Sequence, residues 1–353
     1  MIDVASIVAK FKKVPERLGI DVCSGGIKVV RLNRVTERAF ELTGRGFIDV
    51  DITKATPLEM QRARAMVQQV GGGLRNAALS IEHPTLRVRQ MRIAPMPERD
   101  MLEAIRWNFR EHVEVPMEQY AVGYTPIESA DEGEQRVVMA YGVSRKAVEQ
   151  HTAFTKALGC KVIAVEPVVT AVLAAYDANK DWTEGQYSAA LVVDVHQSYF
   201  LVMSKGVLLF SRPLAGISFE MLIKLIMRNM ALDERPAREE FERWMLGSKG
   251  EVDVEEDLDR RQRFTMTIGH FFSQLVIEVQ RTIDAFCIMY EADKVDIIHV
   301  CGEGARFPGI VEHLKKTLGV NSETFNPFER VKLNDEETPL DSTYATAVGL
   351  AIP

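Results

Sequence analysis

The chain has 353 residues, which is more than one ordinary hydrophobic core accommodates and which fits two domains. Hydrophobic residues make up 46% of it and charged residues 26%, a balance that excludes a disordered or fibrous chain. The 43 basic and 50 acidic residues give a formal charge of −7. This charge argues against nucleic acid as the main partner, because proteins that bind nucleic acid usually carry a basic excess.

The 4 cysteines occur without a CxxC pair or a Cys/His cluster, so we expect reduced thiols in a cytosolic protein. No apolar run approaches the ~20 residues that a membrane-spanning helix needs. The N-terminus also lacks the long apolar stretch of a signal peptide. These features together predict a soluble protein.

The opening segment, residues 1–14, places apolar side chains on one helical face and ends in a group of lysines at positions 10, 12 and 13. A basic amphipathic leader of this kind can lie on an anionic membrane surface. The alternative is a frayed terminal turn.

A first domain is predicted over residues 15–185. Its apolar positions alternate with period two from Leu18 to Leu32, which predicts a β-hairpin that turns at residues 24–26. A third strand follows near 38–42. A helix over 57–70 then ends at three consecutive glycines.

Residues 86–165 mix short strands and helices, which indicates a small α+β lobe inserted into this domain. The strands are expected at 86–93, 120–125, 137–143 and 161–165, and the helices at 97–113, 145–158 and, after the lobe, 168–179.

The second half, residues 186–353, opens on another hairpin, with strands at 189–195, 200–203 and 207–210. Because a repeat of this size is hard to obtain by chance, the sequence predicts two duplicated halves. A long helix with an apolar stripe is expected over 264–290. A helix of small residues at about 342–352 is expected to pack at the domain junction.

The segment 18–30, LGIDVCSGGIKVV, resembles the first phosphate loop of the actin, hexokinase and Hsp70 superfamily. An Asp at a strand end can hold Mg²⁺ through water, and Ser and Gly let backbone N–H groups approach phosphate oxygens. The resemblance implies the actin-like ATPase fold: two duplicated RNase H-like α/β core domains around a nucleotide cleft.

Within that superfamily the chain resembles the PilM family of type IV pilus assembly proteins, relatives of FtsA. The motifs that carry the resemblance are AIRW at 104–107 with Pro116 and Tyr120, Gly159, VEP at 165–167, FSR at 210–212 with Gly216, EVQRT at 278–282, CGEGARFPG at 301–309 and NPF at 326–328.

This resemblance implies binding of ATP and Mg²⁺, the metal held indirectly by Asp21 and Asp194. The implied nucleotide-binding residues are Asp21, Ser24, Gly25, Gly26, Lys28, Asp194, Glu278, Arg281, Gly302, Gly304 and Ala305. Plainer alternatives stay open: an ordinary hairpin turn at 24–26, a salt bridge between Glu278 and Arg281, and close packing at the small residues of 302–305.

The chain departs from the family pattern at four places. His196 stands where the second phosphate loop has Gly, and Phe200 stands where it has Thr. Glu303 separates two glycines that are usually paired, and Thr170 replaces the Gln that positions water in actin. We therefore expect weakened ATP binding, at most a weak ATPase, and no catalytic residue to assign.

For a PilM-like protein the expected partner is the N-terminal cytoplasmic peptide of a PilN-like inner-membrane protein, so that the chain is cytoplasmic and peripheral at that membrane. The peptide groove would lie between the inserted lobe and the first core domain, with Trp107 and Tyr120 as candidate anchors. Both could instead fill the core of the lobe.

Two other functions stay open at this point. A small-metabolite kinase of the same fold would need a carboxylate base facing a substrate hydroxyl, and no stretch has that constellation. An FtsA-like filament-forming protein is the other alternative, and self-association is left undecided, as is the choice between a pilus and a related secretion system.

Overall fold

The computed structural model describes residues 15–22, 26–36, 39–50, 54–113, 115–127, 135–245, 258–333 and 341–352. The predicted leader over 1–14 and the turn residues Ser24 and Gly25 lie outside these ranges. The chain divides into two units. Unit 1 comprises Met1–Gly185, Met203–Ser211 and Asn326–Pro353, and unit 2 comprises Gln186–Val202 and Arg212–Phe325.

The core of unit 1 is a six-stranded sheet with the order β14-β3-β2-β1-β4-β8. Its strands are β1 (Leu18–Asp21), β2 (Ile27–Arg34), β3 (Phe40–Ile48), β4 (Asn76–Ile81), β8 (Lys161–Pro167) and β14 (Val331–Lys332). β1 pairs antiparallel with β2, where Asp21 lies opposite Lys28, and parallel with β4. β1 is buried throughout its length, as expected for a central strand covered on both faces.

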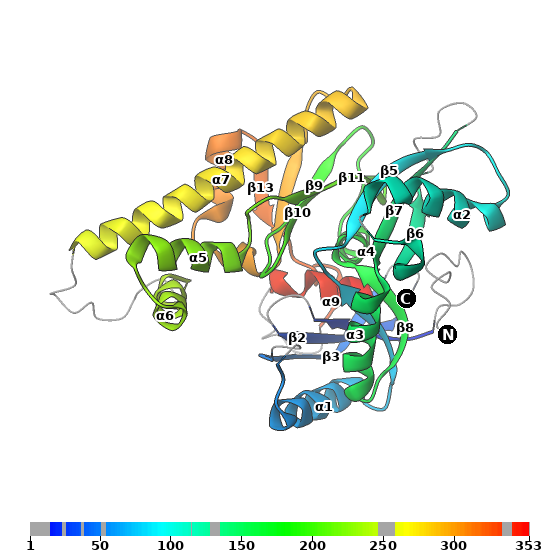
Figure 1. Cartoon of the computed structure of the whole chain (residues 1–353), viewed down its shortest axis with the longest axis horizontal. Coiled ribbons are helices and arrows are strands. Elements are labelled where there is room, and N and C mark those ends of the chain that lie inside the picture. The colour runs from blue at the N-terminus through cyan, green and yellow to red at the C-terminus, as the bar shows by residue number, and fades with distance from the viewer. Residues whose placement is uncertain are drawn as a thin grey trace. The chain divides into compact units, whose positions relative to one another are not determined.

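Helices cover both faces of this sheet (Figure 1). α1 (Pro57–Gly71) begins at a capping box, in which the side chains of Thr56 and Glu59 each accept from the other residue's backbone N–H, and it packs on β2 and β3. α4 (Val168–Asn179) and α9 (Ala345–Ala351) pack against each other, and α9 also contacts β1, β2 and β4.

A lobe sheet with the order β5-β7-β6 interrupts the core of unit 1. It consists of β5 (Arg87–Ile93), β6 (Tyr120–Pro126) and β7 (Arg136–Ser144), and α2 (Glu98–Phe109) contacts β5 and β6. α3 (Arg145–Ala157) follows β7 directly and contacts the strands of both sheets. The expected lobe range of 86–165 extended into β8, but β8 pairs with β4 in the core sheet.

Unit 2 contains a five-stranded sheet with the order β11-β10-β9-β12-β13. Its strands are β9 (Ser188–Val192), β10 (Ser198–Ser204), β11 (Val207–Leu214), β12 (Ile297–Cys301) and β13 (Asn321–Thr324), and the tip of the β10–β11 hairpin, Met203–Ser211, groups with unit 1. The order matches β3-β2-β1-β4-β8 of unit 1, and both β1–β4 and β9–β12 are parallel pairs. The predicted actin-like fold with two duplicated core sheets is therefore confirmed.

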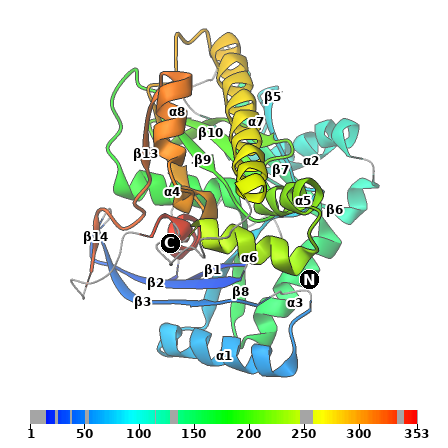
Figure 2. The same cartoon turned by 90° about the vertical axis from the view of Figure 1, so that its left-hand side faces the viewer.

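The helices of unit 2 are α5 (Phe219–Met230), α6 (Glu234–Met245), α7 (Leu258–Tyr290) and α8 (Ile310–Leu318) (Figure 2). α7 begins at Leu258, earlier than the expected start at residue 264. Its buried residues, which include Phe264, Phe271 and Leu275, recur at the helical spacing from which the sequence analysis predicted this helix. No helix in the described part of the chain is both long and apolar enough to cross a membrane.

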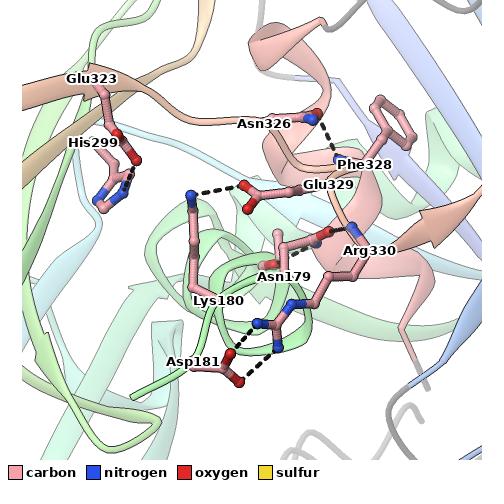
Figure 3. Close-up of polar contacts among 10 residues, drawn as sticks. Asn179, Lys180, Asp181, His299, Glu323, Asn326, Phe328, Glu329 and Arg330 are labelled. Atoms are coloured by element: carbon pink, nitrogen blue, oxygen red, sulfur yellow. Dashed lines mark hydrogen bonds and ion pairs between the residues drawn. The ribbon is translucent and has the colours of Figure 1, made fainter. Parts of the chain in front are cut away.

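The returning segment Asn326–Arg330 is tied to the end of α4 within unit 1 (Figure 3). Lys180 Nζ lies 2.7 Å from the Glu329 carboxylate, and Arg330 forms a two-pronged ion pair with Asp181. The Arg330 backbone N–H also donates to the side-chain oxygen of the buried Asn179, at 3.0 Å. These contacts direct the chain into β14.

Two glycines set how closely α9 approaches its neighbours. A Cβ at Gly349 of α9 would lie 1.7 Å from the carbonyl oxygen of Ala171 in α4, and a Cβ at Gly19 of β1 would lie 2.0 Å from that of Ala347. Both obstacles are backbone atoms, which cannot turn aside as a flexible side chain can. The small residues of the C-terminal helix are therefore required by its packing on the core of unit 1.

We predict that Gly349→Ala lowers the free energy of unfolding by about 3 kcal/mol, because the added methyl group forces the two helices apart. Gly269→Ala in α7 is the matched control, since nothing lies within 4 Å of its added Cβ. That control should gain about 1 kcal/mol from its higher helix propensity. Urea unfolding measures both. Equal effects of the two substitutions would contradict the close approach of α9 to α4.

Candidate functional site

A pocket of about 370 Å³ lies within unit 1, between the lobe sheet on one side and α3 with β8 on the other. Its lining is mostly apolar and draws on β6, β7, α3 and β8, with Ile81 from the end of β4 and Leu86 from the connection between β4 and β5. Figure 1 shows α3 running below β6 and β7, toward the core sheet. The pocket thus lies where the sequence analysis expected a groove.

The lobe strands form one wall because alternate side chains of a strand point to opposite faces. Tyr120 and Val122 of β6, with Val138 of β7, pack into one cluster with Met101, Ile105 and Phe109 of α2. Ala121 and Val143 belong instead to a second cluster with Ile81 and Ala147, on the side of α3. The pocket lies on this second side and is lined there by Ala121, Gly123, Tyr141 and Val143.

The opposite wall is one stripe of α3 together with β8. The lining residues of α3 are spaced by three or four and share one helical face: Arg145, Val148, Glu149, Thr152, Ala153 and Lys156. The helix begins at Ser144, whose hydroxyl accepts from the Ala147 N–H at 3.3 Å. β8 adds Val162 to Val165 and stands last in the order of the core sheet.

Charge in the lining is confined to three side chains of α3: Arg145, Glu149 and Lys156. Arg145 Nε donates to the Glu118 carbonyl at 2.8 Å, which anchors the guanidinium beside β6. A mostly apolar pocket with a few polar groups is the usual form of a binding site.

Thr85, in the connection from β4 to β5, fastens the lobe to the core. Its hydroxyl accepts from the Ser144 N–H at 3.1 Å and lies 2.8 Å from His83 Nδ1, and its carbonyl accepts from the Tyr120 hydroxyl. Desolvation by burial lowers the pKa of His83, which favours the neutral imidazole. This set of contacts ties the β4–β5 connection to the start of β6 and the end of β7.

The two aromatic residues predicted to anchor a peptide lie elsewhere. Tyr120 is 2% exposed and fills the lobe core, and Trp107 is 71% exposed on α2, with the Arg110 guanidinium 5.7 Å from its ring centroid. Neither is among the described residues that line the pocket. The lining residues were not predicted from the sequence. The alternation along β6 could have indicated them, because it places Tyr120 on the face toward α2 and Ala121 and Gly123 on the opposite face.

The predicted nucleotide residues of unit 1 that are described lie together at the β1–β2 hairpin. Asp21 is 1% exposed, and its carboxylate accepts from the Ser80 hydroxyl at 2.8 Å. The Lys28 ammonium lies 5.8 Å from the ring centroids of both Phe47 and Tyr344. Gly26 is packed closely, since a Cβ there would meet the Ile48 carbonyl and the Phe47 ring at 2.7 Å.

Asp194 of unit 2 follows β9 and is buried. Its carboxylate accepts from the Val195 N–H at 3.0 Å, and its own N–H donates to the Ser198 hydroxyl at 3.3 Å. His196, which stands at the expected glycine, lies 2.9 Å from a carboxylate oxygen of Glu220. These contacts of the loop are all with other residues of unit 2.

The small residues after β12 pack against Val193. A Cβ at Gly302 would lie 2.7 Å from the Val193 carbonyl, and one at Gly304 would lie 2.4 Å from the Val193 side chain. The Gly304 N–H donates to the same carbonyl at 2.9 Å, and the Ala305 N–H donates to Gly302. Close packing therefore accounts for both glycines without a ligand.

Glu278 and Arg281 form the salt bridge that the sequence analysis kept as an alternative. Glu278 is 8% exposed and lies 2.8 Å from Arg281, with Arg212 at 3.5 Å on its other oxygen. Over the described ranges, no group of three or more His, Cys, Asp and Glu side chains is arranged to hold a metal ion.

The chain is similar to known proteins in sequence and in fold. The sequence model of the family described as type IV pilus assembly protein PilM matches residues 250–353. A search of curated proteins finds no match. Among solved structures, a chain of the PilM–PilN type IV pilus biogenesis complex superposes with a TM-score of 0.79 at 20% identity, covering 96% of this chain and 98% of that chain.

A second similar structure is the ethanolamine utilization protein EutJ from Carboxydothermus hydrogenoformans, with a TM-score of 0.51 at 13% identity, covering 99% of this chain and 94% of that one. The protein therefore has the actin-like ATPase fold. Its resemblance to the PilM family is confirmed by sequence over residues 250–353 and by fold over nearly the whole chain.

One ion pair next to the pocket gives a pH-dependent prediction. Glu166 of β8 precedes the lining residue Pro167, and its carboxylate lies 3.0 Å from Arg17, which also donates to the Ile352 carbonyl at 2.7 Å. Burial raises the pKa of Glu166 above its ordinary 4.5, and the Arg17 guanidinium acts in the opposite direction. Arg17 thus stabilises the ionised form of a carboxyl that burial disfavours.

We predict that Arg17→Met lowers the free energy of unfolding by about 3 kcal/mol at pH 8, because it leaves a buried carboxylate without its partner. A carboxyl with a raised pKa destabilises the fold when ionised, so the loss should shrink as pH falls from 8, because Glu166 takes up a proton above its ordinary pKa of 4.5. Denaturation at several pH values measures this, with Arg17→Met/Glu166→Gln as the pH-independent control. A loss that is constant with pH would contradict the pairing.

Proposed function

We propose that this protein is a cytoplasmic, actin-like adaptor of a type IV pilus assembly platform at the inner membrane. Its task is to hold the extended N-terminal cytoplasmic peptide of a PilN-like membrane protein in the pocket between the lobe sheet and α3–β8. The observation that carries the proposal is this pocket, which is already formed within unit 1. The fold of the chain also resembles that of a chain in the PilM–PilN complex.

The pocket suits an extended peptide in shape and chemistry. β6 and β8 stand last in the orders of their sheets, so each can offer backbone groups to an added strand. The apolar lining between them, which includes Val143, Val148 and Val165, would bury alternate side chains of the peptide. Peripheral attachment to the membrane then follows from the partner, and the leader over residues 1–14 would add weak attraction to anionic lipid.

The lining also distinguishes this proposal from a metabolite kinase. A kinase requires a carboxylate base that faces the substrate hydroxyl. Among the described pocket residues Glu149 is the single carboxylate, and it is exposed to solvent. This favours a binding protein. Neither a filament of FtsA type nor a secretion platform finds support in a specific contact.

The direct test is binding of a fluorescein-labelled synthetic peptide that carries the N-terminal cytoplasmic sequence of the PilN-like protein from the same organism. Ala153→Arg places a long side chain in the pocket from an exposed position of α3 and should weaken binding at least a hundredfold, about 2.7 kcal/mol. Fluorescence anisotropy measures the dissociation constant.

Two matched controls accompany this test. Gln150→Arg adds the same charge to an exposed α3 position that is not in the lining, and Trp107→Ala removes the exposed aromatic residue of α2. Both should bind as the unaltered protein does. If Ala153→Arg retains full affinity, or if Trp107→Ala abolishes binding, the proposed pocket is not the peptide site.

We further propose that ATP with Mg²⁺ binds weakly and is hydrolysed slowly or not at all. In unit 1, Asp21 would hold Mg²⁺ through water and Lys28 would contact phosphate. Bound ATP would place negative charge beside that hairpin. The glycines at 302 and 304 pack on Val193, and His196 faces Glu220, whose carboxylate would repel phosphate. Thr170 donates to the Pro167 carbonyl, so its hydroxyl is engaged within α4.

Calorimetric titration with ATP, together with a phosphate-release assay, checks this expectation. We predict a dissociation constant well above that of relatives with intact loops and release close to the uncatalysed background. Asp21→Ala should weaken ATP binding further and leave phosphate release at the background. Rapid release that is lost in Asp21→Ala would show that the phosphate loops work despite their substitutions.

A further inference from the structure

Thr152 is the one hydroxyl-bearing residue of α3 among the residues that line the pocket. The residue is 3% exposed, and its Oγ1 has no hydrogen-bond partner among the described residues. Burying a hydroxyl without a partner costs about 1–3 kcal/mol, so such atoms are uncommon in a folded chain. Because Thr152 is a lining residue of the pocket, the partner of this hydroxyl can arrive with a ligand.

Thr155, three residues further along the same helix, shows the usual arrangement. It is fully buried, and its hydroxyl donates to the His151 carbonyl four residues earlier, at 3.0 Å. The corresponding acceptor for Thr152 is the Val148 carbonyl, yet no such bond is formed. Of these two threonines on one helix, the one that lines the pocket, Thr152, lacks a hydrogen-bond partner, and the one that does not line it, Thr155, has one.

Tyr141 repeats the feature on the opposite wall. It lines the pocket from β7, is 4% exposed, and its hydroxyl also lacks a hydrogen-bond partner in the described part of the chain. Burial raises the pKa of this phenol, which keeps it protonated, and the nearby Thr125 hydroxyl acts in the opposite direction without reaching hydrogen-bond geometry. Hydroxyls that lack partners therefore stand on both walls.

We infer that Thr152, with Tyr141 opposite, hydrogen-bonds one uncharged polar group of the bound peptide, an amide or a carbonyl, beneath its apolar side chains. The inference rests on the proposed function, since it names what the peptide must carry. The group is uncharged because two neutral buried hydroxyls cannot offset the desolvation of a full charge. The charged lining side chains Glu149 and Lys156 are exposed, and Arg145 is engaged by the Glu118 carbonyl. The pocket therefore selects a peptide with a buried polar group over a wholly aliphatic one.

The test uses the full chain and the same labelled peptide. Thr152→Val keeps the shape of the side chain and removes the hydroxyl, so it should weaken binding about tenfold, which corresponds to about 1.4 kcal/mol. Thr152→Ser retains the hydroxyl and should restore most of the affinity. Thr155→Val is the matched control on the same helix and should bind as tightly as the unaltered protein.

Thermal unfolding of the free protein separates a recognition role from a structural one. Replacing an unpartnered buried hydroxyl with a methyl group should leave the midpoint of Thr152→Val unchanged or higher. A midpoint several degrees lower with unaltered affinity would overturn the inference, because the hydroxyl would then stabilise the fold.

The two proposals fail in different ways. If the unaltered protein binds the peptide and Thr152→Val binds it equally well, the inference alone is overturned. If the unaltered protein does not bind the peptide, the proposed function fails and the inference fails with it. Loss of affinity in Thr152→Val, recovery in Thr152→Ser and no change in Thr155→Val would support both.

Discussion

Alternate side chains of a strand point to opposite faces, and in the lobe sheet this constraint produces two different surfaces from one set of strands. The face that carries Tyr120 and Val138 is covered by α2 and forms a closed core. The face that carries Ala121 and Tyr141 meets α3 and β8 across a pocket. A shift of one residue in the pairing of β6 with β7 would exchange the two faces, so the pocket depends on this register.

The second wall depends on how unit 1 closes its own core. β8 joins the core sheet beside β4. The C-terminal helix α9 can pack on β1 because Gly19 admits the α9 backbone, and it can pack on α4 because its own Gly349 admits the α4 backbone. Arg17 connects this helix to Glu166, which lies in the same strand as the pocket residues Val162 to Val165. On the other wall, Thr85 ties the β4–β5 connection to the start of β6 and the end of β7. Such internal contacts preorganise the pocket, which lowers the cost of ordering it on binding.

The sequence predicted most of the strands, the duplicated halves and the inserted lobe because periodicity is a local signal, but it missed the short strands β13 and β14. It could not decide where side chains met distant partners. Glu278 could have contacted a ligand, but its contact with Arg212 lies 66 residues away in the sequence. Trp107 and Tyr120 were predicted as anchors because they are aromatic, but the direction in which each side chain points depends on how α2 packs on the lobe sheet. The hydroxyl of Thr152 gave no signal, since its lack of a partner is a property of the folded chain.

The central claim is that the pocket between the lobe sheet and α3–β8 receives the partner's peptide, and hydrogen–deuterium exchange tests it most directly. Amide exchange of the full chain is measured by mass spectrometry with and without the N-terminal peptide of the PilN-like protein. The account predicts slower exchange in β6, α3 and β8, with no change in α7 or α2. Protection confined to α2 around Trp107, or to the helices of unit 2, would contradict it.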